Sequence, residues 1–253
     1  MRTNLIKTVT AGVIAAGLLG GCATQANKDP LEGLNRGIYK FNDTIDKAAV
    51  KPVAGAYKAV VPSPLRLGVS NFFSNLGDVV TVVNDLLQFR FSKAMDDAGR
   101  VAINTTFGIA GIFDWASKDG IEKRNEDFGQ TLAYWGWQDS AYLVLPFLGP
   151  STLRDTGGLI VDGALFDPVY YVDDPAARNQ LLIASFIDKR SQYLPGSDLL
   201  DEAALDPYVF MRDAYLQRRS NMTHDGEERE RVKEESDAED AVPADKVASA
   251  VAN

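Results

Sequence analysis

The sequence LGGC at residues 19–22 places the strongest constraint on how this chain folds. It follows a positively charged start, with Arg2 and Lys7, and an apolar run over residues 8–19 that is too short to span a bilayer as a helix. A bulky aliphatic residue, two small residues and a cysteine form the pattern of a bacterial lipoprotein signal. We therefore predict that residues 1–21 are a removed signal peptide and that Cys22 begins the mature chain, acylated with fatty acids such as palmitate.

The lipid anchor predicted at Cys22 indicates where the chain works. Buried acyl carbons contribute roughly 0.8 kcal/mol each, and several chains together hold a protein firmly on a membrane. Ala23 follows the cysteine, whereas Asp at this position favours retention in the inner membrane of enteric-type bacteria. We predict a lipid-anchored protein on the periplasmic side of the cell outer membrane, with residues 22–28 as a lipidated linker. The alternative, an ordinary signal peptide, would leave an odd thiol in an oxidising compartment.

The residue composition argues against several classes of function. Cys22 is the only cysteine, so its lipidation leaves no disulfide, thiol nucleophile or thiolate metal site. The only histidine, His224, lies beside an acidic tail, which argues against zinc sites and acid/base catalysis built on histidine. The sequence contains no nucleophile elbow, P-loop or dinucleotide fingerprint. We expect no enzyme activity, cofactor or metal, and an acidic exported chain has neither the charge nor the access for nucleic acid.

The acidic charge of the chain is concentrated near its C-terminus. Residues 225–240 contain nine acidic and three basic residues, which accounts for -6 of the net charge of -9. This stretch has no aromatic residue, so it buries too little apolar surface to offset the entropy of ordering. We predict a disordered tail over residues 221–253. An acidic docking tail for a basic periplasmic partner is the alternative.

The sequence pattern of residues 29–220 predicts one mainly α-helical domain. Asp29 and Pro30 precede Glu32 at the spacing of a capping box, which predicts a helix start there. An apolar stripe at alternating spacings predicts an amphipathic helix that ends before Pro52. The stripe consists of Leu31, Leu34, Ile38, Phe41 and Ile45.

Further helices are predicted along the same domain. Residues 65–76 carry a second helical stripe. Residues 79–83 and 86–91 are rich in β-branched and aromatic residues and fit helix or strand, of which we favour helix. Long alternating runs are scarce and Asn-Gly turns are absent, which argues against an all-β sandwich. An Asp-Pro pair, which suits a helix start, recurs at residues 167–168, 174–175 and 206–207.

Short apolar bursts within the domain leave two interpretations open. The residue types favour a buried core, whereas the acyl anchor favours contact with the membrane interface, where aromatic side chains are common. Trp135 and Trp137 suit the interface, since an indole keeps its N–H in water there. The bursts occupy residues 107–115, 132–137, 142–148 and 159–171.

Four blocks of this sequence resemble the MlaA (VacJ) lipoprotein family. They are DPLEGLNRGIYKFND at residues 29–43, GQTLAYWGW at 129–137, LVLPFLGPSTLRDTGG at 143–158 and DPYVFMRDAYLQRR at 206–219. The blocks stand in the family's order behind the lipoprotein signal, and the resemblance covers essentially the whole mature body except the tail. Residues 117–126 match poorly and are interpreted as a charged, insertion-like loop.

The resemblance implies a ring-like bundle of amphipathic helices around a central channel, lipid-anchored in the inner leaflet of the outer membrane. Members of the family draw mislocalised phospholipids out of the outer leaflet and pass them to a periplasmic lipid-carrier protein, which maintains lipid asymmetry. Outer-membrane trimeric porins are the usual partners, and no covalent chemistry is implied. The sequence itself has no mature run of about 20 apolar residues, so we expect no spanning helix of conventional length.

A phospholipid in such a channel needs a polar route for its headgroup and an apolar route for its tails, because burying an unpaired charge is costly. Arg154 and Asp155 are the candidates for headgroup contact, and their simpler alternative is a mutual ion pair or a helix cap. The candidates for lining the channel or touching acyl chains are Phe41, Asn42, Leu145 and Phe147, whose aromatic members alternatively fill a core.

Three functions are open at this point. The first is a lipid-translocating component of the outer membrane. The second is a passive envelope scaffold or adhesion-related lipoprotein, which needs no channel. The third is an envelope hydrolase built on carboxylates alone, because a sequence does not reveal which carboxylates converge.

Overall fold

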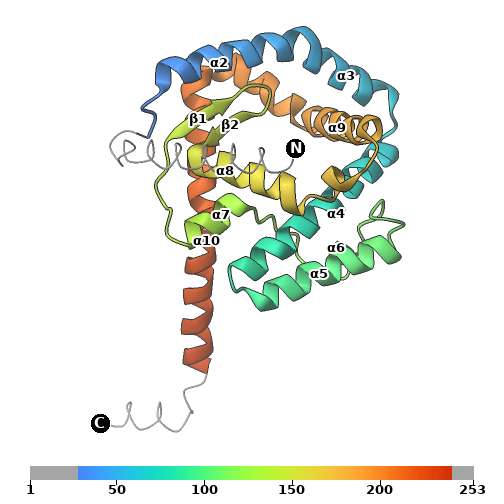
Figure 1. Cartoon of the computed structure of the whole chain (residues 1–253), viewed down its shortest axis with the longest axis vertical. Helices are drawn as coiled ribbons and strands as arrows, with labels where there is room; N and C mark the ends of the chain where they lie inside the picture. The colour runs from blue at the N-terminus through green and yellow to red at the C-terminus, as the bar shows by residue number, and fades with distance from the viewer. Residues whose placement is uncertain (1–27, 241–253) are drawn as a thin grey trace. The chain divides into compact units, whose positions relative to one another are not determined.

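The computed structural model describes residues 28–240 (Figure 1). The predicted signal peptide, Cys22 and the rest of the linker up to residue 27 lie outside the described residues, as does the tail after Asp240. The described chain is mainly α-helical, as predicted, and none of its helices is long and apolar enough to cross a membrane. The chain divides into two compact units, Met1–Arg212 and Asp213–Asn253.

The first unit contains nearly all described elements. Its helices are α2 (Glu32–Ile45), α3 (Lys51–Val60), α4 (Ser63–Leu87), α5 (Phe91–Thr106), α6 (Trp115–Lys118), α7 (Phe128–Tyr134), α8 (Leu153–Val161) and α9 (Pro175–Ala203). Short π and 3-10 turns are η2 (Asp46–Val50), η3 (Asp162–Phe166) and η4 (Pro168–Tyr171). The strands are β1 (Tyr142–Leu145) and β2 (Gly149–Thr152), and α10 (Pro207–Asp240) runs from the first unit into the second.

Contacts between elements of the first unit close into a circuit. Helix α3 packs on α9, α9 on α4, α4 on α7, and α7 on α8. Helix α8 contacts β2, which pairs with β1, and β1 packs on α2, which continues through η2 into α3. Helix α5 packs along α4, and α6 packs on α5 (Figure 1). The circuit is the ring-like arrangement expected from the family resemblance.

Two of the predicted Asp-Pro helix starts are confirmed by their capping geometry. The carboxylate of Asp174 accepts hydrogen bonds from the amides of Ala176 and Ala177 at the start of α9. Asp206 accepts hydrogen bonds from the first amides of α10 in the same way. At the third site Asp167 caps a 3-10 turn, η4, rather than a long helix. A short carboxylate satisfies amides that have no partner inside the helix, which explains why the motif works locally.

The predicted first helix is present as α2, which begins at Glu32 and ends at Ile45, before Pro52, but its cap and its continuation into further helical turns were not predicted. Asp29 does not cap α2, whose N-cap residue is Leu31, because the Asp29 carboxylate is buried and engaged by side chains from other parts of the chain. The helical path continues beyond α2. A π turn, η2, precedes α3, and Pro52 lies in the first turn of α3, where its missing N–H costs little.

A hairpin that the sequence reading missed lies between residues 142 and 152. Strands β1 and β2 pair antiparallel, with Leu145 opposite Gly149. Phe147 and Gly149 adopt left-handed φ angles of 65° and 84°, so the turn forms without an Asn-Gly pair. The helix favoured for residues 86–91 is also wrong in part. Helix α4 ends at Leu87, and Phe89 has a φ of 61° before α5 begins.

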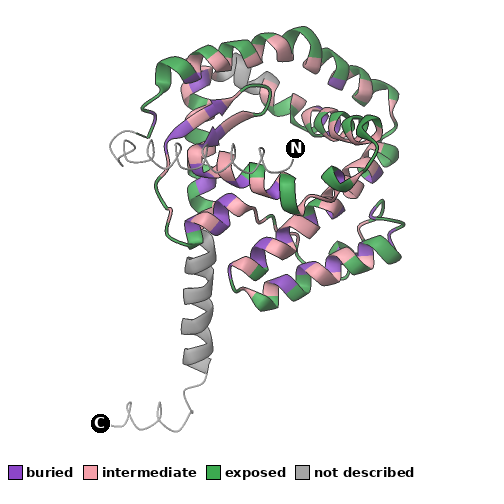
Figure 2. Cartoon of the chain, in the orientation of Figure 1, coloured by how far each residue is buried: buried purple, intermediate pink, exposed green. Residues whose placement is uncertain are grey.

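Buried residues are interspersed with exposed ones along the described helices (Figure 2), and their types are inverted relative to an ordinary globular protein. In the described part of the chain nine hydrophobic residues are buried, against twenty polar or charged residues, whereas thirty large hydrophobic residues are exposed. The core interpretation of the apolar bursts is therefore wrong for much of residues 107–115 and 159–171. Their exposed members are Phe107, Ile109, Ile112, Phe113, Trp115, Leu159, Ile160, Leu165, Tyr170 and Tyr171.

The second unit differs from the prediction of a disordered tail over residues 221–253. Helix α10 continues through the acidic stretch as far as Asp240, and residues 241–253 lie outside the described residues. Glu, Arg and Lys have high helix propensity, so a charged stretch of this composition is compatible with a helix even without apolar surface to bury.

Candidate functional site

Two asparagines of α2 fasten the hairpin to the helix. Asn35 is fully buried, its Oδ1 accepts a hydrogen bond from the Val144 amide at 2.9 Å, and its Nδ2 donates to the Tyr142 carbonyl at 3.1 Å. Two helical turns further on, Asn42 repeats the pattern on the Leu145 carbonyl. Because residues seven apart lie on one face of a helix, the side-chain amides pair with β1 as a neighbouring strand would.

The structure brings four of the candidate residues together at this place. Asn42 Nδ2 donates to the Leu145 carbonyl at 2.8 Å, and Asn42 Oδ1 accepts from the Phe147 amide at 2.8 Å. The rings of Phe41 and Phe147 meet edge to face, 5.4 Å between centroids, although the two residues are 47% and 60% exposed. Both polar atoms of the Asn42 side chain are hydrogen-bonded to backbone groups, so the exposed part of this cluster is apolar. Contact of these residues with lipid stays a prediction.

Arg154 and Asp155 lie elsewhere, at the start of α8. Arg154 is buried, its Nε donates to Asp155 Oδ1 at 3.0 Å, and its Nη1 donates to the carbonyl oxygens of Trp137 and Gln138. The Asp155 amide donates to the Thr152 hydroxyl, which caps α8. The simpler alternative, a mutual ion pair, is therefore present in the structure. Contact of either residue with a headgroup stays a prediction.

A second polar cluster joins the start of α2 to the start of α10. We call it the Asp29 cluster; it comprises Asp29, Asn35, Tyr208 and Arg212. Asp29 accepts from Asn35 Nδ2 at 2.8 Å, from the Tyr208 hydroxyl at 2.5 Å and from Arg212 Nη1 at 3.5 Å. Burial and the bond to Asp29 raise the pKa of the Tyr208 hydroxyl well above its usual range. This cluster fixes the chain directly after the predicted lipidated linker.

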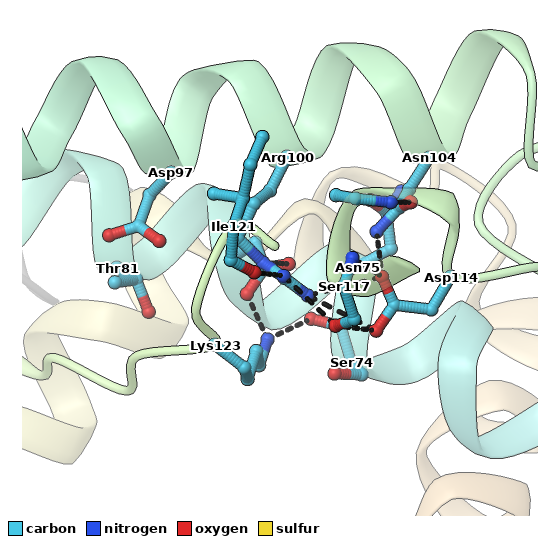
Figure 3. A network of polar contacts seen from close by, with 12 residues as sticks. Ser74, Asn75, Thr81, Asp97, Arg100, Asn104, Asp114, Ser117, Ile121 and Lys123 are labelled. Carbon is cyan, nitrogen blue, oxygen red and sulfur yellow. Dashed lines mark hydrogen bonds and ion pairs between the residues drawn. The ribbon is translucent and has the colours of Figure 1, made fainter. Parts of the chain in front are cut away.

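A third cluster lies between α4, α5 and the segment 119–127, and we call it the α4–α5 network (Figure 3). Lys123 Nζ contacts Asp78 and donates to the Ser74 carbonyl at 3.0 Å. Arg100 Nε lies 3.6 Å from Asp78 Oδ2. Arg124 Nε donates to Asp97 Oδ2 at 3.1 Å. The members are Asp78, Asp85, Asp97, Arg100, Asp114, Lys123, Arg124 and Glu126.

The network shows that the charged loop within residues 117–126 is packed into the structure. This segment supplies the cations for buried carboxylates of both helices, and its Ile121 carbonyl accepts a hydrogen bond from Arg100 Nη1. At its edge, Asp114 faces Arg100 at 3.2 Å. Burial alone would raise the pKa of Asp114, but hydrogen bonds from Ser117 and Asn104 and the charge of Arg100 lower it to about 2.

The buried polar residues of α4 were not predicted from the sequence. The buried residues recur at spacings of three and four along an otherwise apolar helix, which is the periodic signal that would have found them. They are Asn75, Asp78, Thr81, Asp85 and Gln88. Asn84 extends the pattern, since its Nδ2 donates to Asp162 Oδ1 and its Oδ1 accepts from the Thr131 hydroxyl. Carboxylates thus converge here, but among the described residues no three histidine, cysteine or acidic side chains form a possible metal site.

Comparison with known proteins gives one consistent result. A family model described as MlaA lipoprotein matches residues 27–222. The Intermembrane phospholipid transport system lipoprotein MlaA of Escherichia coli K12 is 36% identical over 229 residues, covering 87% of this chain and 90% of the relative. Its counterpart of the same name in Haemophilus influenzae is 32% identical over 231 residues, covering 87% and 92%.

The similarity extends to proteins without an assigned function and to a solved structure. An uncharacterised protein of Rickettsia prowazekii is 37% identical over 186 residues, 74% of each chain. A structure solved in work on the structural basis for maintenance of bacterial outer membrane lipid asymmetry is 33% identical. It superposes with a TM-score of 0.69 and covers 78% of this chain and 100% of that one.

Proposed function

The chain belongs to the MlaA lipoprotein family, and on that premise we propose that it removes mislocalised phospholipids from the outer leaflet of the outer membrane and passes them to a periplasmic lipid carrier. The coarser role, intermembrane phospholipid transport in the bacterial envelope, is the one its named relatives carry. The finer proposal includes a lipid anchor at Cys22, a trimeric porin as the outer-membrane partner, and no covalent chemistry.

The observation that carries the proposal is the inverted burial. Among the described residues thirty large hydrophobic residues are exposed, while the buried set is mostly polar. In water such a surface would be unfavourable by roughly 25 cal/mol for each Å² of apolar area, but acyl chains solvate it without that cost. None of the described helices spans a membrane, so the apolar surface suits a protein seated in one leaflet.

The polar interior supports the transport part of the proposal. A headgroup crossing a leaflet boundary needs polar partners, because an unpaired buried charge costs several kcal/mol even after relaxation. The closed circuit of elements in the first unit provides a ring that buries many polar side chains and exposes many large apolar ones. We propose that the lipid passes through this ring, with the headgroup on the polar side.

The test of transport is the amount of phospholipid in the outer leaflet of the outer membrane, read by a lipid acylation or phospholipase assay restricted to that leaflet. Cells without the gene should show an increase, which the wild-type protein reverses. Cys22→Ala should fail to reverse it, whereas Thr24→Ala, two residues along the linker, should succeed. No increase under envelope stress would overturn the proposal and favour the passive scaffold.

The test of membrane embedding uses the three tryptophans. Each single-tryptophan variant keeps one indole, and its fluorescence is compared in vesicles of ordinary and of acyl-brominated phospholipid. Trp115 and Trp135, which are 42% and 52% exposed, should be quenched strongly, and the half-buried Trp137 less. Equal fluorescence in both lipids would contradict the embedding of this surface.

A further inference from the structure

Asp85 is the least compensated charged group in the α4–α5 network. It is 0% exposed, and neither of its carboxylate oxygens receives a hydrogen bond. Other buried polar residues of α4 have polar partners. Asp78 contacts Lys123 and lies near Arg100, and Asn84 is hydrogen-bonded to Asp162 and Thr131. An ionised carboxylate without donors in a dry interior is costly, so this residue needs an explanation.

The partner of Asp85 is a second carboxyl group, that of Asp97 on α5. Asp97 is also 0% exposed; its Oδ2 accepts from Arg124 Nε at 3.1 Å, whereas its Oδ1 receives no hydrogen bond. Helices α4 and α5 pack along each other, both side chains are fully buried between them, and hydrogen bonding to Asp97 is among the causes that raise the pKa of Asp85. Two carboxylate oxygens are both acceptors, so a bond between them exists only when one carries a proton.

We propose that Asp85 holds a proton at neutral pH and donates it in a hydrogen bond to Asp97, and that loss of this proton under alkaline conditions loosens the packing of α4, α5 and the segment 119–127. Asp97 is the acceptor, because its Oδ2 already accepts from Arg124 and its Oδ1 receives no other hydrogen bond. One proton then satisfies an orphaned oxygen on each residue. This inference goes beyond lipid transport and does not depend on it.

The charges around Asp85 favour the proton. Asp97 from α5 and Glu126 from the segment 119–127 are negative, and Arg124 is the cation that acts on Asp85. The Arg124 guanidinium donates hydrogen bonds to Asp97, Asp96 and the Lys93 carbonyl. Two other elements reach the next residue, Asn84. Thr131 of α7, which is uncharged, and Asp162 of η3 are both hydrogen-bonded to the Asn84 side chain. Burial first, then Asp97 and Glu126, raise the pKa of Asp85 to about 8.

A divalent cation is the other way to join two carboxylates, and the surroundings disfavour it. Calcium and magnesium take six or more oxygen ligands, mostly from carboxylates, carbonyls and water. Among the described residues no three acidic or histidine side chains converge as a metal site, and Arg124 already holds one Asp97 oxygen. The proton fits two oxygens and needs no further ligand.

The direction in which stability changes with pH distinguishes a protonated Asp85 from an ionised one. A carboxyl group whose pKa is raised in the folded state contributes stability that is complete below its ordinary pKa and is lost as pH rises through about 8. Asp85→Asn copies the shape and hydrogen-bonding ability of the protonated acid at every pH. The substitution should therefore stabilise the protein in alkaline solution and make little difference in acid.

The experiment measures the melting temperature of the full mature lipoprotein in detergent at a series of pH values. Near pH 9, Asp85→Asn should melt about 3 °C or more above the wild type, and the gap should shrink as pH falls and close towards the ordinary pKa of 3.8. Asp96→Asn, one residue from Asp97 but with its side chain 57% exposed, should follow the wild type. Asp97→Asn should melt lower at every pH, because it leaves Arg124 without its buried anion.

A lower melting temperature for Asp85→Asn in alkaline solution would overturn the proposal, since it would mean that an ionised Asp85 has a cationic partner. A rise in wild-type melting temperature with added calcium or magnesium that Asp85→Asn abolishes would also overturn it in favour of a metal site. The wild type alone offers a second measurement if the variant does not fold. Infrared spectra at neutral pH should show the C=O stretch of a protonated carboxyl group, which disappears above about pH 8; absence of that band refutes the proton on Asp85.

Discussion

The Asp29 cluster and the α4–α5 network both bury aspartates, but they compensate the charge in different ways. Both oxygens of Asp29 accept hydrogen bonds, from Asn35, Tyr208 and Arg212. Neither oxygen of Asp85 does. The contrast teaches that a protein with a polar interior neutralises a buried carboxylate either by surrounding it with donors or by leaving a proton on it.

The two solutions have different consequences for the molecule. Donors from three side chains hold the Asp29 cluster together at the place where the chain leaves its predicted lipid anchor. A proton makes the α4–α5 network dependent on the medium. The following substitutions test this contrast.

The largest effect is expected where the donors lose their common acceptor. Asp29→Ala leaves three donors without it, and at about 1 kcal/mol for each hydrogen bond the free energy of unfolding should fall by about 3 kcal/mol. Urea unfolding of the detergent-solubilised protein measures the loss. Asp43→Ala, which removes only a half-exposed pair with Lys47, serves as the control and should cost about 0.5 kcal/mol or less. Equal losses in the two variants would contradict the role given to Asp29.

A smaller loss is expected when the network loses a cation. Lys123→Met leaves Asp78 with Arg100 at 3.6 Å, and unfolding should become easier by about 2 kcal/mol because the Asp78 charge is buried. Adding Asp78→Asn should recover part of the loss. A double-mutant cycle measures this coupling, and additive effects of the two substitutions would show that the contact contributes nothing.

Tyr208→Phe removes one of the three donors to Asp29 and keeps the ring that stacks with Arg36 and Tyr142. We expect a loss of about 1 kcal/mol in the free energy of unfolding, the value of a single hydrogen bond. Tyr193→Phe is the matched control, since Tyr193 is 57% exposed. A change in Tyr208→Phe as large as in Asp29→Ala would mean that the hydroxyl alone holds the cluster.

The smallest effect is a gradual change with pH, followed by amide hydrogen exchange. The contribution of Asp114, with its pKa of about 2, is present above the ordinary value and is lost as pH falls. The contribution of Asp85 is complete in acid and is lost as pH rises through about 8. After correction for intrinsic exchange rates, α4 and α5 should lose protection in alkali while the start of α2 keeps it. Uniform loss in both regions would remove the contrast.

Helix capping was predictable from the sequence where the capping residue bonds only to the residues that follow it. Asp174 and Asp206 cap the helices that follow them, as their Asp-Pro pairs indicate. Asp29 stands in the same motif and does something else, because Tyr208, 179 positions away, supplies a hydrogen bond to it. The capping box was a correct local pattern that a tertiary contact overrode.

The candidate site was predictable only in part. Phe41, Asn42, Leu145 and Phe147 were selected from separate blocks, and the structure brings them together through Asn42 and the aromatic pair. Asn35, the stronger clamp on β1, was missed because a lone asparagine in a helix has no distinctive sequence signature. The role of Lys123 and Arg124 was not predicted either, because the charged loop gives no sign in the sequence that its cations reach buried carboxylates of α4 and α5.

The sequence by itself determined the helical class and the family, and it contains the pattern from which the lipoprotein signal is predicted, because each depends on residue type and short-range spacing. Only the tertiary structure decided which side of each helix is buried. Large members of the apolar stripes, such as Leu34, Phe41 and Leu65, are exposed here, whereas polar residues of α4 are buried, where Asn75 and Asp78 meet Thr105 and Arg100 of α5. The physical reason is that periodicity defines a helix's two faces but not the medium that each one meets.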